Sequence, residues 1–311
     1  MRATQTTTYR SLQSFLDRTS DKLASLQLQA ATGKRMNRPS DDPTAISPVL
    51  SARTQIKTSD RYIETIETGL DRVDGMDGYL DSIENTLVRI KEISIASVNG
   101  ALSQADMQTY ADEVHSLRES LLSDTNSSID GKYLFAGFSE KTQPFSLNPN
   151  YPATEPNPVN YNGDYGVLEF EISPNELIGV NITGNGLMLG DLNNDGATDA
   201  GAVDIFALVT NLEEELQANN PLGVAALIDP LEDAANQVRS QRSLKGNVGH
   251  RLEVARDHME QIKIDMEEFR SRFEDADLLE TITDMEKQQQ SYQAALSVTG
   301  KVSELSILNY I

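Results

Sequence analysis

Residues 252–273 read LEVARDHMEQIKIDMEEFRSRF, and this stretch decides the fold class. Its apolar residues alternate three and four positions apart, which is the spacing of a coiled-coil seam. The spacing predicts a long helix that buries one narrow stripe against a partner helix. The seam comprises Leu252, Ala255, Met259, Ile262, Met266, Phe269 and Phe273, and after a phase break Leu278, Ile282, Met285, Tyr292, Leu296 and Thr299 continue it.

The first 125 residues or so show the same three-four spacing and predict further long helices. The series are Leu12, Leu16, Thr19, Leu23, Leu26 and Ala30, then Val73, Leu80, Ile83, Leu87, Ile90 and Ser94, then Tyr110, Val114, Leu117 and Leu121. Both ends of the chain therefore carry a seam that needs a partner. We expect the N-terminal and C-terminal helices to lie side by side, as coiled-coil arms at one end of a helical rod.

The pattern changes abruptly at Gly131. Five prolines between residues 144 and 174 interrupt every helical pattern, and residues 133–135, 167–172 and 177–182 resemble strands separated by turn signals such as Asn162-Gly163. Helical spacing returns near Asp204. The sequence thus predicts a mainly α protein with an inserted small β domain. We expect terminal helical arms at 1–40 and 280–311, a long helical rod at 41–130 and 201–279, and an outer β-rich module at 131–200.

The composition excludes several classes of partner and site. The formal charge is −22, and the sequence has neither a basic stripe that could bind nucleic acid nor a cationic segment that could bind an anionic membrane. The absence of Cys removes disulfides, thiol nucleophiles and most structural zinc sites. We find no secretory signal and no apolar run long enough to span a membrane. Export, if it occurs, would use another route.

The C-terminal residues 302–311 are apolar to the last position, where a free terminus is normally polar. Exposed apolar surface at a helix end favours coverage by another subunit. A C-terminal helix packed on the chain's own core is the alternative. We place assembly ahead of it.

A calcium site is the one metal site for which the sequence offers a candidate. Asp191, Asn193, Asp195 and Gly196 reproduce the start of a D-x-N-x-D-G calcium loop, whose alternate oxygens would surround a hard cation. The twelfth position is Ala202 in place of a bidentate carboxylate, although Asp199 or Asp204 could substitute. An Asn/Asp/Gly turn is the favoured reading.

Catalytic motifs are absent from the sequence. There is no G-x-S-x-G, no P-loop and no G-x-G-x-x-G, and His250 and His258 lie about two helical turns apart, too far for a zinc pair. We expect the three histidines to be solvated helix residues. The sequence predicts no catalytic residue and no cofactor, and converging carboxylates leave a hydrolase as the remaining enzymatic alternative.

Residues 32–45, Thr-Gly-Lys-Arg-Met-Asn-Arg-Pro-Ser-Asp-Asp-Pro-Thr-Ala, resemble the loop after the first helix in the bacterial flagellin superfamily. The Asn-Arg-Pro-Ser-Asp-Asp-Pro form is closer to the hook–filament junction proteins of that superfamily than to flagellin. Residues 131–138, 246–253, 274–277 and 292–296 resemble further family blocks in the expected order. The ends also favour the junction proteins, because flagellins usually open near Ile-Asn-Thr-Asn and close near Leu-Leu-Arg.

The resemblance implies a structural subunit, secreted to the extracellular flagellum by the type III export apparatus without a cleavable signal. The implied partners are hook-associated protein 1, flagellin, further copies in a ring and a flagellar export chaperone on the C-terminal arm. Pro39, Asp41 and Asp42 would order the loop, since prolines stop a helix and Asp side chains accept backbone N–H bonds. We expect the assembly contacts to be made by Leu12, Leu16, Leu23, Leu26, Pro39, Asp41, Asp42, Leu296, Val302, Leu305 and Leu308.

Two functional alternatives stay open from the sequence. A minor flagellin of the same superfamily would form a filament by itself, whereas a calcium-dependent surface adhesin would act through the middle module. A plain connector between two helices would explain the prolines and aspartates of residues 39–43 equally well. The arms are expected to be partly disordered until neighbours cover them.

Overall fold

The computed structural model describes residues 2–99, 102–152, 157–193 and 195–308, without the side chains of helix residues 2–6, 8 and 302–308. The chain divides into two compact units. We call residues 1–60 and 260–311 the terminal unit and residues 61–259 the central unit. Two long helices, α2 (Ile46–Asn99) and α6 (Ile228–Glu274), contribute to both.

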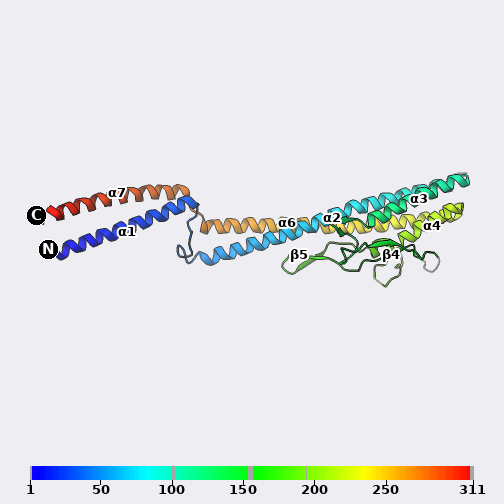
Figure 1. The fold of residues 1–311 in the computed structure, drawn as a ribbon, viewed down its shortest axis with the longest axis horizontal. Coiled ribbons are helices and arrows are strands. Elements are labelled where there is room, and N and C mark those ends of the chain that lie inside the picture. Colours follow the sequence, from blue (N-terminus) through cyan, green and yellow to red (C-terminus); the bar gives the residue numbers. More distant parts are fainter. Residues whose placement is uncertain (1, 100–101, 153–156, 194, 309–311) are drawn as a thin grey trace. The chain divides into compact units, whose positions relative to one another are not determined.

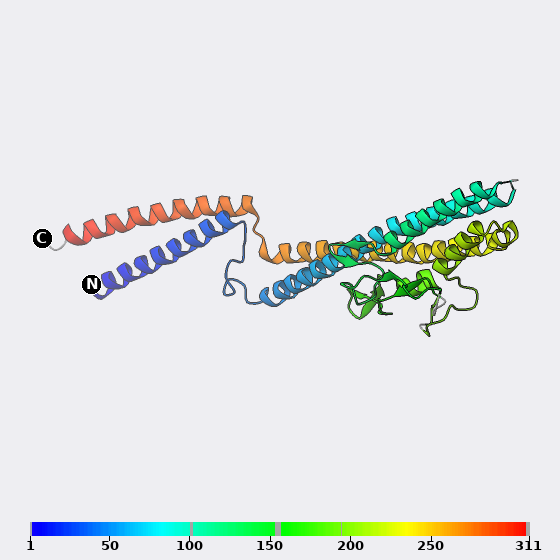
Figure 2. The same ribbon diagram turned by 45° about the vertical axis from the view of Figure 1, so that its right-hand side comes forward.

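The terminal unit contains the two helical arms of the chain. α1 (Arg2–Thr32) and α7 (Leu278–Leu308) lie side by side, as Figures 1 and 2 show. The predicted pairing of the N-terminal and C-terminal helices is confirmed. The unit also holds the first turns of α2 and the last turns of α6.

Antiparallel helices form the body of the central unit. α2 is joined to α3 (Gln104–Thr125) by the Arg89–Glu113 ion pair at 2.8 Å, and to α6 by Arg242, which binds Asp77 and Asp81. α3 in turn lies against α4 (Ile205–Gln217). The seam predicted on α2 lies in the core of this unit: Val73, Leu80, Ile83, Leu87, Ile90 and Ser94 are all buried, and Met76 is buried with them.

The helices of the central unit begin where the sequence offers a cap. Ser103 accepts the backbone N–H of Asp106, whose carboxylate accepts that of Ser103, so a capping box starts α3. The carboxylate of Asp204 accepts the N–H of Ala207 at the start of α4. α5 (Pro221–Ala226) follows Asn220, and α6 then runs unbroken through Gly246 and Gly249.

The inserted β region consists of three two-stranded antiparallel hairpins among the described residues. They are β1 (Ser128–Ile129) with β2 (Lys132–Tyr133), β3 (Phe145–Leu147) with β4 (Val159–Tyr161), and β5 (Glu169–Ser173) with β6 (Glu176–Gly179). A short π-helical turn, η1 (Asn185–Leu189), follows them. The mainly α fold with a small β insertion is therefore confirmed, although the strands are shorter than the apolar runs suggested.

Side chains from the helices hold the hairpins in place. Lys245 of α6 donates to the carbonyl of Gly179 at 3.3 Å, and Tyr62 of α2 donates to Glu171 at 3.2 Å. Gly75 of α2 allows close approach, since a Cβ there would lie 2.2 Å from the Ile129 side chain. The finer division into arms, rod and outer module stays a prediction.

Candidate functional site

The pair of arms in the terminal unit is the candidate site, because it carries the seams that the sequence left without partners. Thr19 and Leu26 of α1 and Thr281 and Ala295 of α7 are buried, and Gln288 of α7 donates to the Thr19 carbonyl at 3.3 Å. Small residues at three of these positions let the two helix backbones approach closely. The seam is thus closed by few large side chains.

The predicted contact residues of the two arms differ in burial. Leu26 is buried, whereas Leu12, Leu16 and Leu23 are half-buried. Leu296 is 47% exposed, because its neighbour Ala295 occupies the buried position of the seam. The side chains of Val302, Leu305 and Leu308 lie outside the described residues. Their roles against a neighbouring subunit stay predictions.

Large apolar side chains remain on the outer faces of both arms. Each is more than a third exposed in the isolated chain. On α1 these are Tyr9, Phe15 and Leu28, and on α7 they are Leu278, Leu279, Ile282, Leu296 and Val298. Large exposed apolar side chains on a pair of helices are suited to contact other helices.

The loop between α1 and α2 is attached to the break between α6 and α7. α1 is followed by Gly33, whose φ of +69° is accessible to glycine at low cost. The carbonyl of Gly33 accepts the N–H of Ala276 at 2.9 Å, and the N–H of Arg35 donates to the carbonyl of Glu274 at 2.8 Å. These backbone bonds place the loop beside the start of α7.

The aspartates of the loop bind backbone N–H groups, as the sequence suggested. The Asp41 carboxylate accepts the N–H groups of Asn37 at 3.0 Å and Arg38 at 2.7 Å. The Asp42 carboxylate, near the start of α2, accepts a hydrogen bond from the Thr44 hydroxyl at 2.6 Å. This hydrogen bond is the main cause that lowers the pKa of the Asp42 carboxyl. Pro39 is exposed.

Glu274 is the residue of this site that sequence reasoning missed. Its side chain is 2% exposed and its Oε1 binds Lys34 Nζ at 2.5 Å and Arg53 Nη2 at 2.7 Å. Burial raises the pKa of the Glu274 carboxyl, but the hydrogen bonds from Lys34 and Arg53 outweigh burial and the pKa falls below its ordinary value. No sequence pattern connects residues 34 and 274, so only the fold could reveal this cluster.

The Asp191 loop uses its side chains to bind its own backbone. The Asp191 carboxylate accepts the N–H groups of Asp195 at 3.1 Å and Gly196 at 2.9 Å, and Asn193 Oδ1 also accepts the N–H of Asp195 at 2.9 Å. These are the bonds of an Asx turn. Among the described residues, no group of three or more His, Asp or Glu is placed to hold a metal ion.

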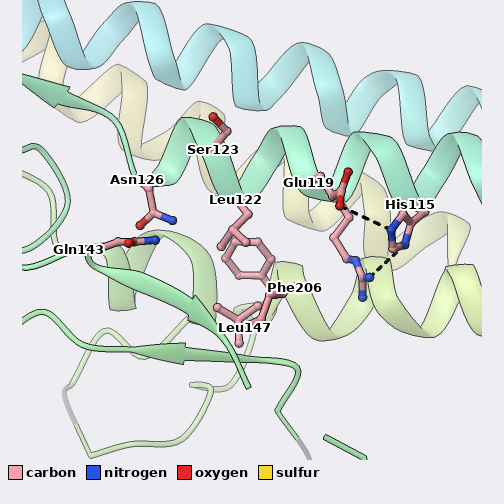
Figure 3. Close-up of a pocket in the computed structure, with 10 residues that line it drawn as sticks. His115, Glu119, Leu122, Ser123, Asn126, Gln143, Leu147 and Phe206 are labelled. Atoms are coloured by element: carbon pink, nitrogen blue, oxygen red, sulfur yellow. Dashed lines mark hydrogen bonds and ion pairs between the residues drawn. The ribbon is translucent and has the colours of Figure 1, made fainter. Parts of the chain in front are cut away.

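A hollow lies in the central unit, between α3, α4 and the β3–β4 hairpin. Figure 3 shows its apolar floor of Leu122, Leu147 and Phe206 beside His115. His115 is an exposed residue of α3, as the sequence suggested, and its Nδ1 lies 2.9 Å from Glu213 Oε1. Asn126 is already bound in both directions to the backbone of Phe145. The hollow therefore offers an apolar floor and polar groups that are largely engaged within the chain.

The two units differ sharply in charge. The terminal unit has 14 Lys and Arg against 16 Asp and Glu, whereas the central unit has 12 against 32. Nearly all of the net charge of −22 therefore lies outside the arms. No helix in the described part of the chain has both the length and the apolar character of a membrane span.

Family comparisons match both ends of the chain. The family described as bacterial flagellin N-terminal helical region matches residues 4–140, and the bacterial flagellin C-terminal helical region matches residues 228–311. The flagellar hook-associated protein 3 of Escherichia coli K12 is 32% identical over 120 residues, which is 38% of each chain. Flagellin of Bacillus subtilis 168 is 24% identical over 280 residues, 88% of this chain and 87% of that protein.

Solved structures support the fold. A putative flagellar hook-associated protein from Vibrio parahaemolyticus aligns with a TM-score of 0.65 and 19% identity, over 76% of this chain and all of that one. The hook-associated protein 3 of Legionella pneumophila aligns with a TM-score of 0.59 and 18% identity, over 72% of this chain and 97% of that one. At such identities the likeness concerns the fold alone.

Proposed function

Because this chain belongs to the bacterial flagellin superfamily, we propose that it is a structural subunit that joins the hook to the flagellar filament through its terminal helices. It is a flagellar, and hence extracellular, protein. The junction position is supported by the relatives named hook-associated protein 3.

The arms carry this proposal. α1 and α7 pack against each other through a narrow stripe of mostly small residues. Large apolar side chains such as Phe15 and Leu279 remain exposed on their outer faces. Covering those faces with neighbouring helices removes apolar surface from water and stabilises the assembly. The arms are thus suited to bind other helical subunits.

The near neutrality of the terminal unit supports the same proposal. The terminal unit has 14 cationic and 16 anionic side chains, so the terminal units of many copies can lie in contact without strong electrostatic repulsion. The central unit, with its large excess of carboxylates, is suited to face water. This distribution of charge supports assembly through the arms and exposure of the inserted β region to water.

The proposed partners are hook-associated protein 1 on one side and flagellin on the other, with further copies of this chain around a ring. An export chaperone would cover the C-terminal arm before secretion. We propose that the subunit has no catalytic activity, in keeping with a structural family. Each of these partners is a separate prediction.

The test uses a bacterial strain that lacks its own copy of this gene and is complemented with variants. Removal of residues 1–30 or 290–311 should abolish incorporation at the hook tip and release flagellin into the medium. A milder variant, Leu12→Ala with Leu16→Ala and Leu23→Ala, should reduce incorporation while the chain is still exported. As a matched control, Leu222→Ser alters an exposed residue of the central unit and should leave incorporation unchanged.

Intact incorporation of both truncated chains would overturn the proposal. Formation of long filaments by the purified chain alone would favour the minor flagellin instead. Immunogold labelling of isolated flagella distinguishes the outcomes, because a junction subunit is confined to the hook tip and a flagellin is spread along the filament.

A further inference from the structure

We propose that the first turns of α7 from one copy dock into a basic groove between α2 and α6 of the next copy, and that this contact repeats around the ring. The inference rests on the proposed function, because it assumes that several copies meet side by side. It assigns the contact to named residues of the terminal unit.

The groove has a volume of about 540 Å³ and lies within the terminal unit. Its apolar lining comprises Leu50, which is more than half exposed, and the buried Ile56, and its polar lining comprises Arg53, Thr54, Lys57, Asp60 and Arg270. The groove therefore combines an exposed leucine with several cations. An amphipathic helix with the opposite charge would fit this chemistry.

The cations of the groove are only partly neutralised. Asp60 is bound by Lys263 at 2.7 Å, and Glu274 is shared by Arg53 and Lys34, with Arg270 3.8 Å away. Lys57 makes no ion pair with any described residue. In a chain of net charge −22 this groove is a local excess of positive charge that attracts carboxylates.

The opening of α7 has the complementary character. Leu279 is 79% exposed and Ile282, one turn further along the same face, is also exposed. Glu280, Asp284 and Glu286 accompany them, with Lys287 as the nearest cation in the sequence. An acidic residue suits the first turn of a helix, and Asp284 lies 3.4 Å from Lys287, but Glu286 lies beyond the first turn and has no ion pair among the described residues.

A second copy of the chain fits better than a different partner, because both surfaces belong to the terminal unit. Leu279 does not fill the groove of its own chain, since it is largely exposed. Two different patches that complement each other form a heterologous contact, and such a contact closes into a ring when the rotation permits. The same chemistry then repeats at every subunit boundary.

The first test exploits the absence of cysteine from the chain. A variant with Leu50→Cys and Leu279→Cys is expressed in the complemented strain, and assembled flagella are treated with a short bis-maleimide. Cross-linked products should form a ladder at multiples of 34.2 kDa. Each single-cysteine variant, and the pair Leu50→Cys with Leu222→Cys, should give no ladder.

A second test exchanges charge across the contact. Lys57→Glu and Glu280→Lys should each lower the fraction of hooks that carry the subunit, by about threefold, as expected for an exposed charge pair. The doubly substituted chain should recover to near the unsubstituted level. Lys141→Glu, at an exposed site in the central unit, is the control for charge alone.

Leu279→Asp should have the largest effect, roughly thirtyfold, because it places a charge at the centre of the contact. Both Leu279 and Lys57 are exposed, so circular dichroism of the purified variants should show unchanged helix content. Absence of a ladder in flagella that do contain the double-cysteine subunit would overturn the inference and leave the junction function standing. An adduct with flagellin or a hook protein would instead assign the groove to another partner.

Discussion

The apolar seams of α2 in the central unit and α1 in the terminal unit have the same spacing but differ in how deeply their side chains are buried. Leu80, Ile83 and Leu87 of α2 are fully buried because α3 and α6 cover them within one chain. Leu12, Leu16 and Leu23 lie on α1, which packs on α7, and they remain half-buried. Equal spacing therefore predicts a helix that needs partners, and the number of available partners decides whether the chain alone can supply them.

The charge distribution follows the same division. The central unit encloses the larger apolar core and carries the acidic surface, whereas the terminal unit is nearly neutral. Solubility of the monomer and association of the arms are thus placed in different parts of the molecule. The predictions below test that separation.

Two leucine substitutions give the largest expected contrast. Leu87→Ala leaves a cavity in a closed core and should lower the free energy of unfolding of the central unit by about 2–5 kcal/mol. Leu23→Ala removes a half-buried side chain and should cost the monomer about 1 kcal/mol or less. Urea unfolding followed by far-UV circular dichroism measures both. Equal losses would mean that the arm seam is already closed in the isolated chain.

Glu274→Gln tests how firmly the loop is held to the start of α7. The amide keeps the shape of the side chain but leaves Lys34 and Arg53 without their shared carboxylate, which should destabilise the terminal unit by about 1–3 kcal/mol. Hydrogen exchange should accelerate at residues 33–45 and not at Leu87. Glu268→Gln, at an exposed site in the same helix, is the matched control.

The pH dependence of the same residue has a definite sign. The folded-state pKa of Glu274 lies below its ordinary value of 4.5, so its ion pairs stabilise the fold above that pH and lose their effect as the pH falls through the lowered pKa. Exchange at residues 33–45 should therefore rise below about pH 4.5 in the native chain. The Glu274→Gln variant should lack this rise, and a rise of equal size there would assign it to another group.

Salt should act on the two units unequally, with a smaller effect. Added NaCl screens repulsion among the 32 carboxylates of the central unit and should stabilise that unit by less than about 1 kcal/mol. The nearly neutral terminal unit should gain less. Hydrogen exchange at roughly 0.05 M and 0.5 M NaCl, between which the Debye length falls about threefold, compares the two units in one sample. A larger gain in the arms would contradict the charge argument.

Calcium should have no measurable effect on either unit. The carboxylate of Asp191 and the amide oxygen of Asn193 already accept backbone N–H bonds, so a cation would have to displace them. Calorimetry at millimolar calcium should record only the heat of dilution. Binding heat that disappears in Asp191→Asn would restore the calcium site and with it the adhesin alternative.

Sequence reasoning reached the fold class and the pairing of the arms, but it could not identify which face of α7 packs on α1. The three-four spacing included Leu296, although Ala295 is the buried residue, because a pattern of apolar letters cannot register the close helix approach that small residues permit. The proline-rich insertion was recognised as β structure, but its pairing into separate hairpins depended on contacts with α2 and α6.

The sequence by itself determined the long helices, the interrupted middle and the excess of carboxylates, since each is a property of residues close together along the chain. Only the tertiary structure decided that Glu274 meets Lys34 and Arg53 and that Leu50 lies in a basic groove. Such clusters bring together residues more than 200 positions apart. Local spacing carries no information on which distant side chains a folded chain places in contact, because that choice depends on how whole helices pack.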